Sequence, residues 1–278
     1  MSDDLAAALL AHFGERGLRS LDIAPEGPLR SPGLPLQVGP YFTAAEPSEP
    51  LTLGEFAAVL GWDAGETAGQ LRIGADRGAQ LYFAPDRSVR AVVLGTSMPE
   101  LPVNSSVEAF AAGLLLLDRH LPALGDAEDP EAAFGAYVAL RSALLELDPA
   151  AFEERESWWP RVLDDLRLPL NVDSSAAFEY LDAGGAKQIA TSVGGPGLPH
   201  PEELLWYRLR AAGVEPEQVT RVYCELQPCL MPGHYCALWL ADTFTEAEFT
   251  HSFDYGESAR SREDGVKELL VHLAEQSG

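Results

Sequence analysis

The sequence predicts an α+β N-terminal domain followed by an α/β C-terminal domain, the second with three layers and a mixed sheet. Its 278 residues are enough for two hydrophobic cores. The contents of 46% hydrophobic and 22% charged residues are typical of folded globular chains. A cluster of strand-like segments in the first half gives way to alternating strands and helices in the second. We place the domains at residues 1–148 and 149–278.

The N-terminal half is predicted to hold an antiparallel meander flanked by helices, because short β-rich segments are separated by turn residues such as Gly74 and Pro85. Its elements in chain order are a helix from Asp3 to Phe13, a Pro- and Gly-rich loop from Pro25 to Pro40, a helix from Leu53 to Leu60, strands Gln70–Ile73, Gln80–Ala84 and Val89–Leu94, and helices Ser105–Leu117, Glu131–Leu147 and Ala150–Leu166. Asn104 or Ser105 is the expected N-cap of the helix that begins at Ser105.

The C-terminal half follows the order β-β-α-β-α-β-α, which predicts a mixed sheet covered by helices. The expected strands are Phe178–Leu181, Ala186–Ser192, Arg221–Leu226 and Phe249–Asp254. The expected helices are Pro201–Ala212, a helix that follows a cysteine-bearing loop and ends near Ala241, and Glu263–Glu275.

Charge and hydropathy restrict the possible partners and compartments. A net charge of -24 repels phosphates, which argues against tight non-specific binding of DNA or RNA and suits a basic protein partner. The longest apolar stretch, Ala109–Leu117, is too short to cross a bilayer. The acidic start Met1-Ser2-Asp3-Asp4 is unlike a secretory signal, so we expect a cytoplasmic protein with no membrane partner.

The three cysteines, Cys224, Cys229 and Cys236, fall within one short stretch. An odd number of clustered thiols does not indicate a disulfide framework. In a reducing compartment such thiols bind a metal or pack in a core. Cys224 lies in the apolar run Val222-Tyr223-Cys224, which favours a core position for it.

One constellation carries specific chemistry. His200-Pro201-Glu202 begins a predicted helix and is followed, after 25 residues, by Pro228-Cys229 and then by Cys236. One imidazole and two thiolates can hold Zn²⁺ and leave a position for water, and a nearby carboxylate that is not a ligand can move protons. The first helical position suits Pro201.

The stretch from about Phe178 to the C-terminus resembles the nucleotide and nucleic-acid deaminase superfamily, particularly its bacterial toxin-type branches. The resemblance implies that His200, Cys229 and Cys236 are zinc ligands and that Glu202 is the general acid/base. It also implies a nucleobase substrate, in a nucleotide or a nucleic acid.

The spacing of the thiols departs from the C-x-x-C of that superfamily, because six residues separate Cys229 from Cys236. On one continuous helix the two thiols would lie about 10 Å apart, too far to share a metal. We therefore predict that Pro232-Gly233 breaks the helix and lets the segment loop back. If it does not, Cys224 or His234 is the alternative ligand.

Each of these residues also has a purely structural interpretation. Acidic residues in a first helical turn are favoured by the helix dipole, which would explain Glu202 without catalysis. His251 shares one side of its predicted strand with Phe249 and Phe253, so it is expected in the core or on a sheet face rather than as a ligand. Trp206-Tyr207 is expected to pack its helix or to stack on a base, and Trp158-Trp159-Pro160 to cover the domain junction.

The N-terminal half carries a series of short motifs: Gly33-Leu34-Pro35, Gly39-Pro40-Tyr41-Phe42, Leu71 to Gly78, and Val103-Asn104-Ser105-Ser106-Val107 with Phe110. Residues 15–125, which hold these motifs in order, resemble the SUKH superfamily, α+β domains that include immunity proteins against bacterial toxins. The resemblance implies a cognate toxin as a protein partner. Local chemistry alone explains Asn104-Ser105-Ser106 as a helix cap and Gly74–Gly78 as a hairpin.

Two functions follow. The first is a zinc-dependent hydrolytic deaminase fused to a SUKH-like immunity domain. The second is a non-catalytic immunity protein that binds and neutralises a toxin, with a degenerate deaminase-like domain. The sequence leaves the base, the toxin and the oligomeric state open.

Overall fold

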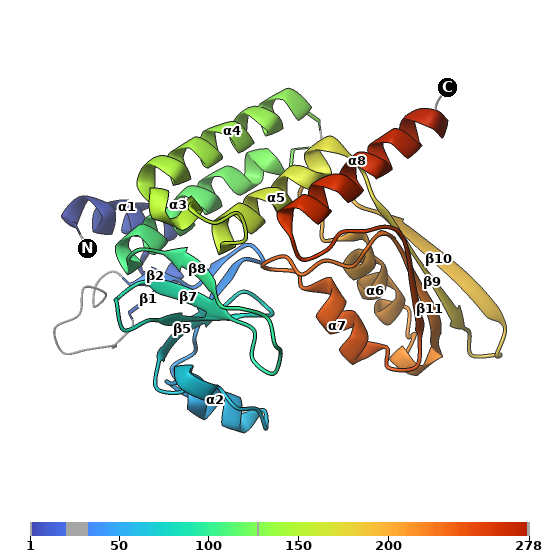
Figure 1. Cartoon of the computed structure of the whole chain (residues 1–278), viewed down its shortest axis with the longest axis horizontal. Helices are drawn as coiled ribbons and strands as arrows, with labels where there is room; N and C mark the ends of the chain where they lie inside the picture. The colour runs from blue at the N-terminus through green and yellow to red at the C-terminus, as the bar shows by residue number, and fades with distance from the viewer. Residues whose placement is uncertain (1, 21–32, 127, 277–278) are drawn as a thin grey trace. The chain divides into compact units, whose positions relative to one another are not determined.

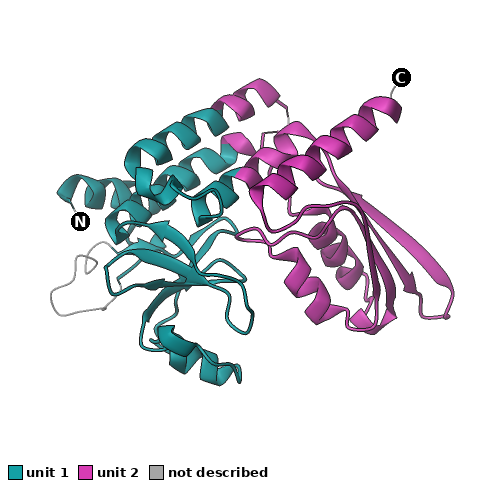
Figure 2. Cartoon of the chain, viewed as in Figure 1, with its two compact units in different colours: residues 1–122, 136–163 teal, residues 123–135, 164–278 magenta. Residues whose placement is uncertain are grey.

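The computed structural model describes residues 2–20, 33–126 and 128–276. The chain forms two compact units, Met1–Pro122 with Ala136–Leu163 (unit 1) and Ala123–Gly135 with Asp164–Gly278 (unit 2), coloured separately in Figure 2. The predicted boundary between residues 148 and 149 stays a prediction, since compactness and independent folding are different properties. Among the described residues, no helix combines the length and the hydropathy that a bilayer span requires.

Unit 1 is built around a six-stranded antiparallel sheet with the order β3-β4-β5-β6-β7-β8 (Figure 1). Its strands are β3 (Gln37–Val38), β4 (Phe42–Ala44), β5 (Leu71–Ala75), β6 (Gln80–Phe83), β7 (Val89–Val92) and β8 (Leu101–Asn104). A separate two-stranded pair joins β1 (Leu18–Arg19) to β2 (Leu34–Pro35). The predicted meander is therefore confirmed, although β1–β4 and β8 were not expected. Part of the predicted loop at Pro25–Pro40 lies outside the described residues.

The helices of the first part of the chain are α1 (Asp3–Phe13), α2 (Leu53–Val59), α3 (Val107–Leu124), α4 (Pro130–Leu147) and α5 (Trp158–Asn171). Thr52 and Glu55 form a reciprocal capping box at the start of α2, with hydrogen bonds of 3.2 and 3.1 Å. At the start of α3, Ser106 Oγ accepts the amide of Ala109 at 3.1 Å, so the cap is Ser106 rather than the predicted Asn104 or Ser105.

The single helix predicted for Ala150–Leu166 was wrong. A 3₁₀ turn at Pro149–Phe152 is followed by a bend, and α5 begins only at Trp158. Pro160 gives the reason, because proline inside a helix clashes with the carbonyl four residues earlier. A helix that begins at Trp158 instead places Pro160 in its first turn, where that clash does not arise.

Both indoles at the start of α5 are buried inside unit 1, and the expectation that they cover a domain junction stays a prediction. Trp158 Nε1 donates to Asp76 Oδ2 at 2.7 Å, and Trp159 Nε1 donates to Asn104 Oδ1 at 2.8 Å. A Cβ on Gly113 would lie 2.7 Å from Cζ2 of Trp159, so glycine is needed for the close approach of α3. The sequence explained Asp76 as a turn residue and Asn104 as a cap residue. Both also accept hydrogen bonds from the buried indoles of the core.

Unit 2 contains the four-stranded sheet β10-β9-β11-β12, in which β11 and β12 are parallel and the other neighbours antiparallel. Its elements are β9 (Ser175–Leu181), β10 (Lys187–Val193), α6 (Pro201–Ala211), β11 (Val219–Leu226), α7 (Cys236–Thr243), β12 (Glu248–Phe253) and α8 (Ala259–Gln276). The predicted order and the mixed sheet are confirmed. A parallel pair needs a crossover connection, and the segment with α7 provides it.

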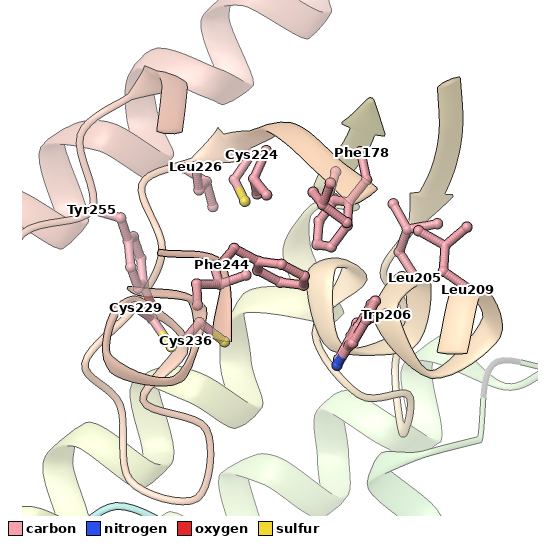
Figure 3. Packing of buried hydrophobic residues seen from close by; sticks show 14 of the residues in the cluster. Phe178, Leu205, Trp206, Leu209, Cys224, Leu226, Cys229, Cys236, Phe244 and Tyr255 are labelled. Atoms are coloured by element: carbon pink, nitrogen blue, oxygen red, sulfur yellow. The ribbon is translucent and has the colours of Figure 1, made fainter. Parts of the chain in front are cut away.

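The core of unit 2 lies where α6 and α7 pack on one face of the sheet (Figure 3). On β11, Val222, Cys224 and Leu226 are buried in this core and alternate with more exposed side chains. Phe244, the C-cap residue of α7, meets Phe178 and Trp206 edge to face, with ring centroids 5.4 and 4.8 Å apart. Such pairs each contribute about 0.5–1.5 kcal/mol beyond the buried area.

The predictions for Trp206-Tyr207 and for His251 can be compared with this packing. Trp206 is buried against the core as expected, whereas its neighbour Tyr207 is half exposed. His251 lies on β12 with an exposed side chain and contacts Asp254 at 3.2 Å, so it has the expected sheet-face position and not a core position.

Candidate metal centre

The cysteine-bearing segment between β11 and α7 is a loop that returns on itself. Residues 227–235 are not helical, and Gly233 and Tyr235 adopt left-handed backbone angles of φ 83° and φ 44°. The loop is closed by a hydrogen bond of 3.0 Å from the amide of Ala237 to the carbonyl of Cys229. The predicted break at Pro232-Gly233 is confirmed, and Cys236 becomes the first residue of α7.

His200 occupies the N-cap position of α6, with Pro201 at the first helical position as predicted. Its Nδ1 lies 3.5 Å from Sγ of Cys229 and 3.4 Å from Sγ of Cys236. The three ligand atoms all lie within 4.8 Å of one another. The structure therefore brings together the three residues that the sequence singled out as metal ligands.

The alternative ligands take other positions. All three thiols belong to the buried cluster of unit 2, but Cys224 lies on β11, above Cys229 and Cys236 in Figure 3, and is not part of the ligand group that those two form with His200. His234 belongs to a different group of possible ligands, with Asp165 and His200.

This donor set fits zinc. With Zn–S bonds of about 2.3 Å and a Zn–N bond of about 2.0 Å, tetrahedral angles place nitrogen and sulfur about 3.5 Å apart. The Nδ1–Sγ distances of 3.4 and 3.5 Å match this separation. Two thiolates and one imidazole are also ligands that zinc prefers, and a structural site would need a fourth protein ligand that the group does not include.

Mutual interactions shift the ionisation of all three residues. Burial opposes ionisation of Cys229, but a hydrogen bond with Cys236 and the charge of His200 lower the pKa of its thiol well below the ordinary value. Burial and the neighbouring Cys229 raise the pKa of Cys236 well above the usual range. Burial disfavours the charged form of His200, yet Cys229 and Asp165 raise its pKa well above the ordinary value. Thiolate and imidazole ligands must lose their protons to bind a metal, so a cation here competes with protons.

Glu202 and Glu203 are neighbours in the first turn of α6 with different surroundings. Glu203 Oε2 accepts the backbone amide of His200 at 3.2 Å, which is the reach-back bond of a capping box. Glu202 is buried, and burial raises the pKa of its carboxyl group. It lines a pocket together with His200 and Cys229. The helix-terminus explanation thus accounts for Glu203, and Glu202 is the carboxylate that faces the pocket.

The pocket beside these residues is partly open to solvent. It is lined largely by apolar groups, including Leu168 and Val172, with a few polar groups such as Gln227 and Tyr255. Concave apolar pockets with few convergent polar groups are the usual form of small-molecule sites.

Sequence reasoning missed two contributors to this region, Asp165 and Tyr255. Asp165 Oδ1 lies 3.0 Å from Nε2 of His200, and Tyr255 lines the pocket. Asp165 sits in α5 about 35 residues before its partner, as one of two adjacent aspartates. Nothing local to the sequence marks it, because its role depends on which helix face is buried.

Two family models match the chain, one in each half. Residues 21–165 match the family model of the SUKH-4 immunity protein, and residues 171–272 match that of the Xanthomonas-like deaminase. Comparisons with curated proteins and with solved structures gave no match.

The chain therefore joins two classes of domain, an immunity-type domain and a deaminase-type domain. It belongs to the SUKH-4 immunity protein family, through a match that includes the buried indoles of α5, and it continues into a deaminase-family domain. Both resemblances predicted from the sequence are confirmed.

Proposed function

We propose that the C-terminal domain is a zinc-dependent hydrolytic deaminase of a nucleobase, fused to a protein-binding immunity domain. In this proposal His200, Cys229 and Cys236 hold the zinc and Glu202 is the general acid/base. The observation that carries it is the convergence of Nδ1 and the two Sγ atoms beside a pocket that Glu202 also lines. The match of residues 171–272 to a deaminase family supports the reaction class.

When bound, zinc lowers the pKa of water enough for hydroxide to be available near neutral pH. Glu202 then carries protons from the attacking water to the ring nitrogen and to the departing amine. Its burial supports this role, because a carboxyl group with a raised pKa gives up a proton less readily than an exposed one and can donate as well as accept. The largely apolar lining supports binding of the flat apolar faces of a nucleobase beside Glu202.

The pocket lining also bears on the substrate. The residues that the structure assigns to this lining include neither lysine nor arginine. The pocket is therefore suited to an uncharged heterocycle such as cytosine or adenine, with any phosphate outside it. The net charge of -24 favours a free nucleoside or nucleotide over a long nucleic acid.

For the N-terminal domain we propose that residues 1–148 bind a cognate toxin in the cytoplasm. Membership of the SUKH-4 immunity family supports a toxin as the partner in general. The acidic composition is complementary to a basic toxin.

The test is a deamination assay with the full chain on cytidine, adenosine, their monophosphates and a single-stranded oligonucleotide, together with measurement of bound zinc. We expect Glu202→Gln to keep its zinc and to lose activity by about 10²–10⁴-fold. The matched control is Glu217→Gln, which changes an exposed glutamate of the same domain and should change neither.

A second function accounts for the opposite result. If the wild-type chain binds zinc and deaminates none of these substrates, the deaminase-like domain is degenerate and the chain is a non-catalytic immunity protein. Binding of a toxin by the full chain would then remain as its activity.

A further inference from the structure

A cluster of buried polar side chains surrounds His200 on the side away from the thiols. We call Asp165, His200, Glu203 and His234 the carboxylate–imidazole cluster. They come from α5, from the N-terminus of α6 and from the loop before α7. Asp165, Glu203 and His234 are all buried, so their polar atoms need partners within the protein.

Within the cluster the two imidazoles share one carboxylate. Asp165 Oδ1 lies 3.0 Å from Nε2 of His200, and its Oδ2 lies 3.4 Å from Nε2 of His234. The two rings stack with centroids 3.8 Å apart and planes at 7°. On the far side of His234, Nδ1 lies 2.6 Å from Oε2 of Glu203, the same oxygen that accepts the amide of His200.

These contacts fix the orientation of one ring. The stack on His234 sets the plane of the His200 imidazole, and the contact with Asp165 sets its rotation within that plane. With Nε2 held by a carboxylate, only Nδ1 is left for a ligand, and Nδ1 is the atom that faces both thiols. A carboxylate on the remote nitrogen also fixes the tautomer of a ligating histidine and makes it a stronger base.

We propose that Asp165, with His234 and Glu203 behind it, is a positioning residue that holds Nδ1 of His200 toward the two thiols and thereby sets the affinity for zinc. This inference rests on the zinc site of the proposed function. It gives a role to Glu203, which otherwise only caps α6, and to His234, which the sequence offered as an alternative ligand.

The competing interpretation is a second cation held by Asp165, His200 and His234, whose ligand atoms also lie within 4.8 Å of one another. The contacts favour the positioning role. Each Nε2 pairs with its own oxygen of Asp165, and His234 is already engaged through Nδ1 with Glu203. A second cation would require His200 to bind that cation through Nε2 while it binds the zinc through Nδ1. We therefore expect about one zinc per chain.

The test uses Asp165→Asn in the full chain, with Asp164→Asn as a matched control. The control removes the same charge from the preceding residue of α5, which contacts Arg167 and Arg262 rather than the cluster. The zinc dissociation constant is measured by competition with a chromophoric chelator, and the Tm of each metal-free protein is measured in parallel. We expect zinc binding to weaken about 10–100-fold in Asp165→Asn. In Asp164→Asn it should stay within about threefold of wild type.

Further variants keep the inference testable if Asp165→Asn does not fold. His234→Gln preserves a hydrogen-bond donor for Glu203 but removes the stacked ring, and we expect a loss of about 10-fold in zinc affinity. The absorption spectrum of the cobalt-substituted His234→Gln protein should retain the bands of the wild-type cobalt–thiolate site, since His234 is not a ligand.

The outcomes separate this inference from the proposed function. Equal zinc affinity in wild type, Asp165→Asn and His234→Gln overturns the positioning role and leaves the zinc site intact. So does an equal loss in Asp165→Asn and Asp164→Asn, or a fall in the metal-free Tm of Asp165→Asn without a fall in zinc affinity. Two zinc ions in wild type, one of them lost in His234→Gln, would show a second cation site instead. Absence of zinc from the wild type would overturn both proposals.

Discussion

Both units of this protein bury a cluster of polar side chains, and the two clusters differ in where their polar atoms point. In unit 1, Asp76 accepts the amide of Ala79 at 2.7 Å and the indole of Trp158, while Asn104 joins Trp159 to Asp148. These contacts tie together backbone and bulky side chains within a core. Nothing in them is a nucleophile or a soft metal ligand.

In unit 2 the buried polar atoms converge on one another and on a pocket. Nδ1 of His200 faces two thiols, and Glu202 lines the pocket with His200 and Cys229. The comparison shows that buried charge alone does not mark a functional site. Metal-ligand or proton-transfer atoms that meet beside an open pocket indicate a functional site. Polar atoms that all hydrogen-bond within the core indicate a structural cluster.

The largest expected effect comes from disrupting the polar cluster of unit 1 while zinc binding by unit 2 is measured. Trp158→Ala removes a fully buried indole, and we expect a loss of about 3–5 kcal/mol in the free energy of unfolding of unit 1. Zinc bound per folded chain should not change. Urea denaturation followed by circular dichroism, with metal analysis of the native protein, checks both. Loss of zinc from the folded variant would contradict the division of roles.

The next test compares two cysteines of unit 2. Cys236→Ser removes a proposed ligand, whereas Cys224→Ser alters a thiol in the hydrophobic core. We expect zinc affinity to fall by more than about 100-fold in Cys236→Ser, which corresponds to roughly 2.7 kcal/mol. Cys224→Ser should lower stability and leave zinc affinity within about threefold. Chelator competition measures the affinities, and the reverse pattern would make Cys224 the ligand.

A smaller effect is expected from the carboxylate of unit 1. Asp76→Ala leaves the amide of Ala79 and the indole N–H of Trp158 without this acceptor, which costs about 1–3 kcal/mol in the free energy of unfolding. In a double-mutant cycle with Trp158→Phe, the coupling energy should be about 0.5–3 kcal/mol. A coupling energy near zero would show that the two groups act separately.

The last test compares two helical glycines, for which alanine substitution should change the free energy of unfolding in opposite directions. Gly113→Ala forces a Cβ to within 2.7 Å of Trp159, so we expect a loss of about 1–3 kcal/mol. Gly135→Ala, at an exposed position of α4 with nothing within 4 Å, should gain about 0.4–1 kcal/mol. Thermal unfolding of both variants provides the measurement. Destabilisation of equal size at both positions would show that Gly113 is not needed for packing against Trp159.

Much of the fold could be predicted from the sequence, because its signals are local. Helix α1 and the order of elements in unit 2 followed from hydrophobic periodicity and turn residues. Strands β3 and β4 were missed since two or three residues are too few for an alternation to be recognised. The break before α5 was missed although Pro160 marks it, because the surrounding composition favours a helix.

Some features of the site could likewise be predicted from the sequence and others could not. The placement of His200, Cys229 and Cys236 together was predicted from the resemblance to deaminases, and Pro232-Gly233 marked the break that lets the second thiol return. The contact between Asp165 and His200 was not, since it joins α5 to α6 through tertiary packing. The resemblance selected Glu202 rather than Glu203, and the structure adds a physical difference between them, because adjacent residues on a helix face different directions.

The closed loop of residues 227–235 has a consequence for the entropy of metal binding. Bringing the ends of a flexible segment of this size together costs roughly 2 kcal/mol of chain entropy. Here folding has already closed the segment, through the hydrogen bond from Ala237 to Cys229 and the left-handed backbone of Gly233 and Tyr235. An ion that arrives finds its two thiols assembled and need not order the chain around itself. We therefore expect a chelator to empty the centre and leave unit 2 folded, so that loading and unloading are reversible.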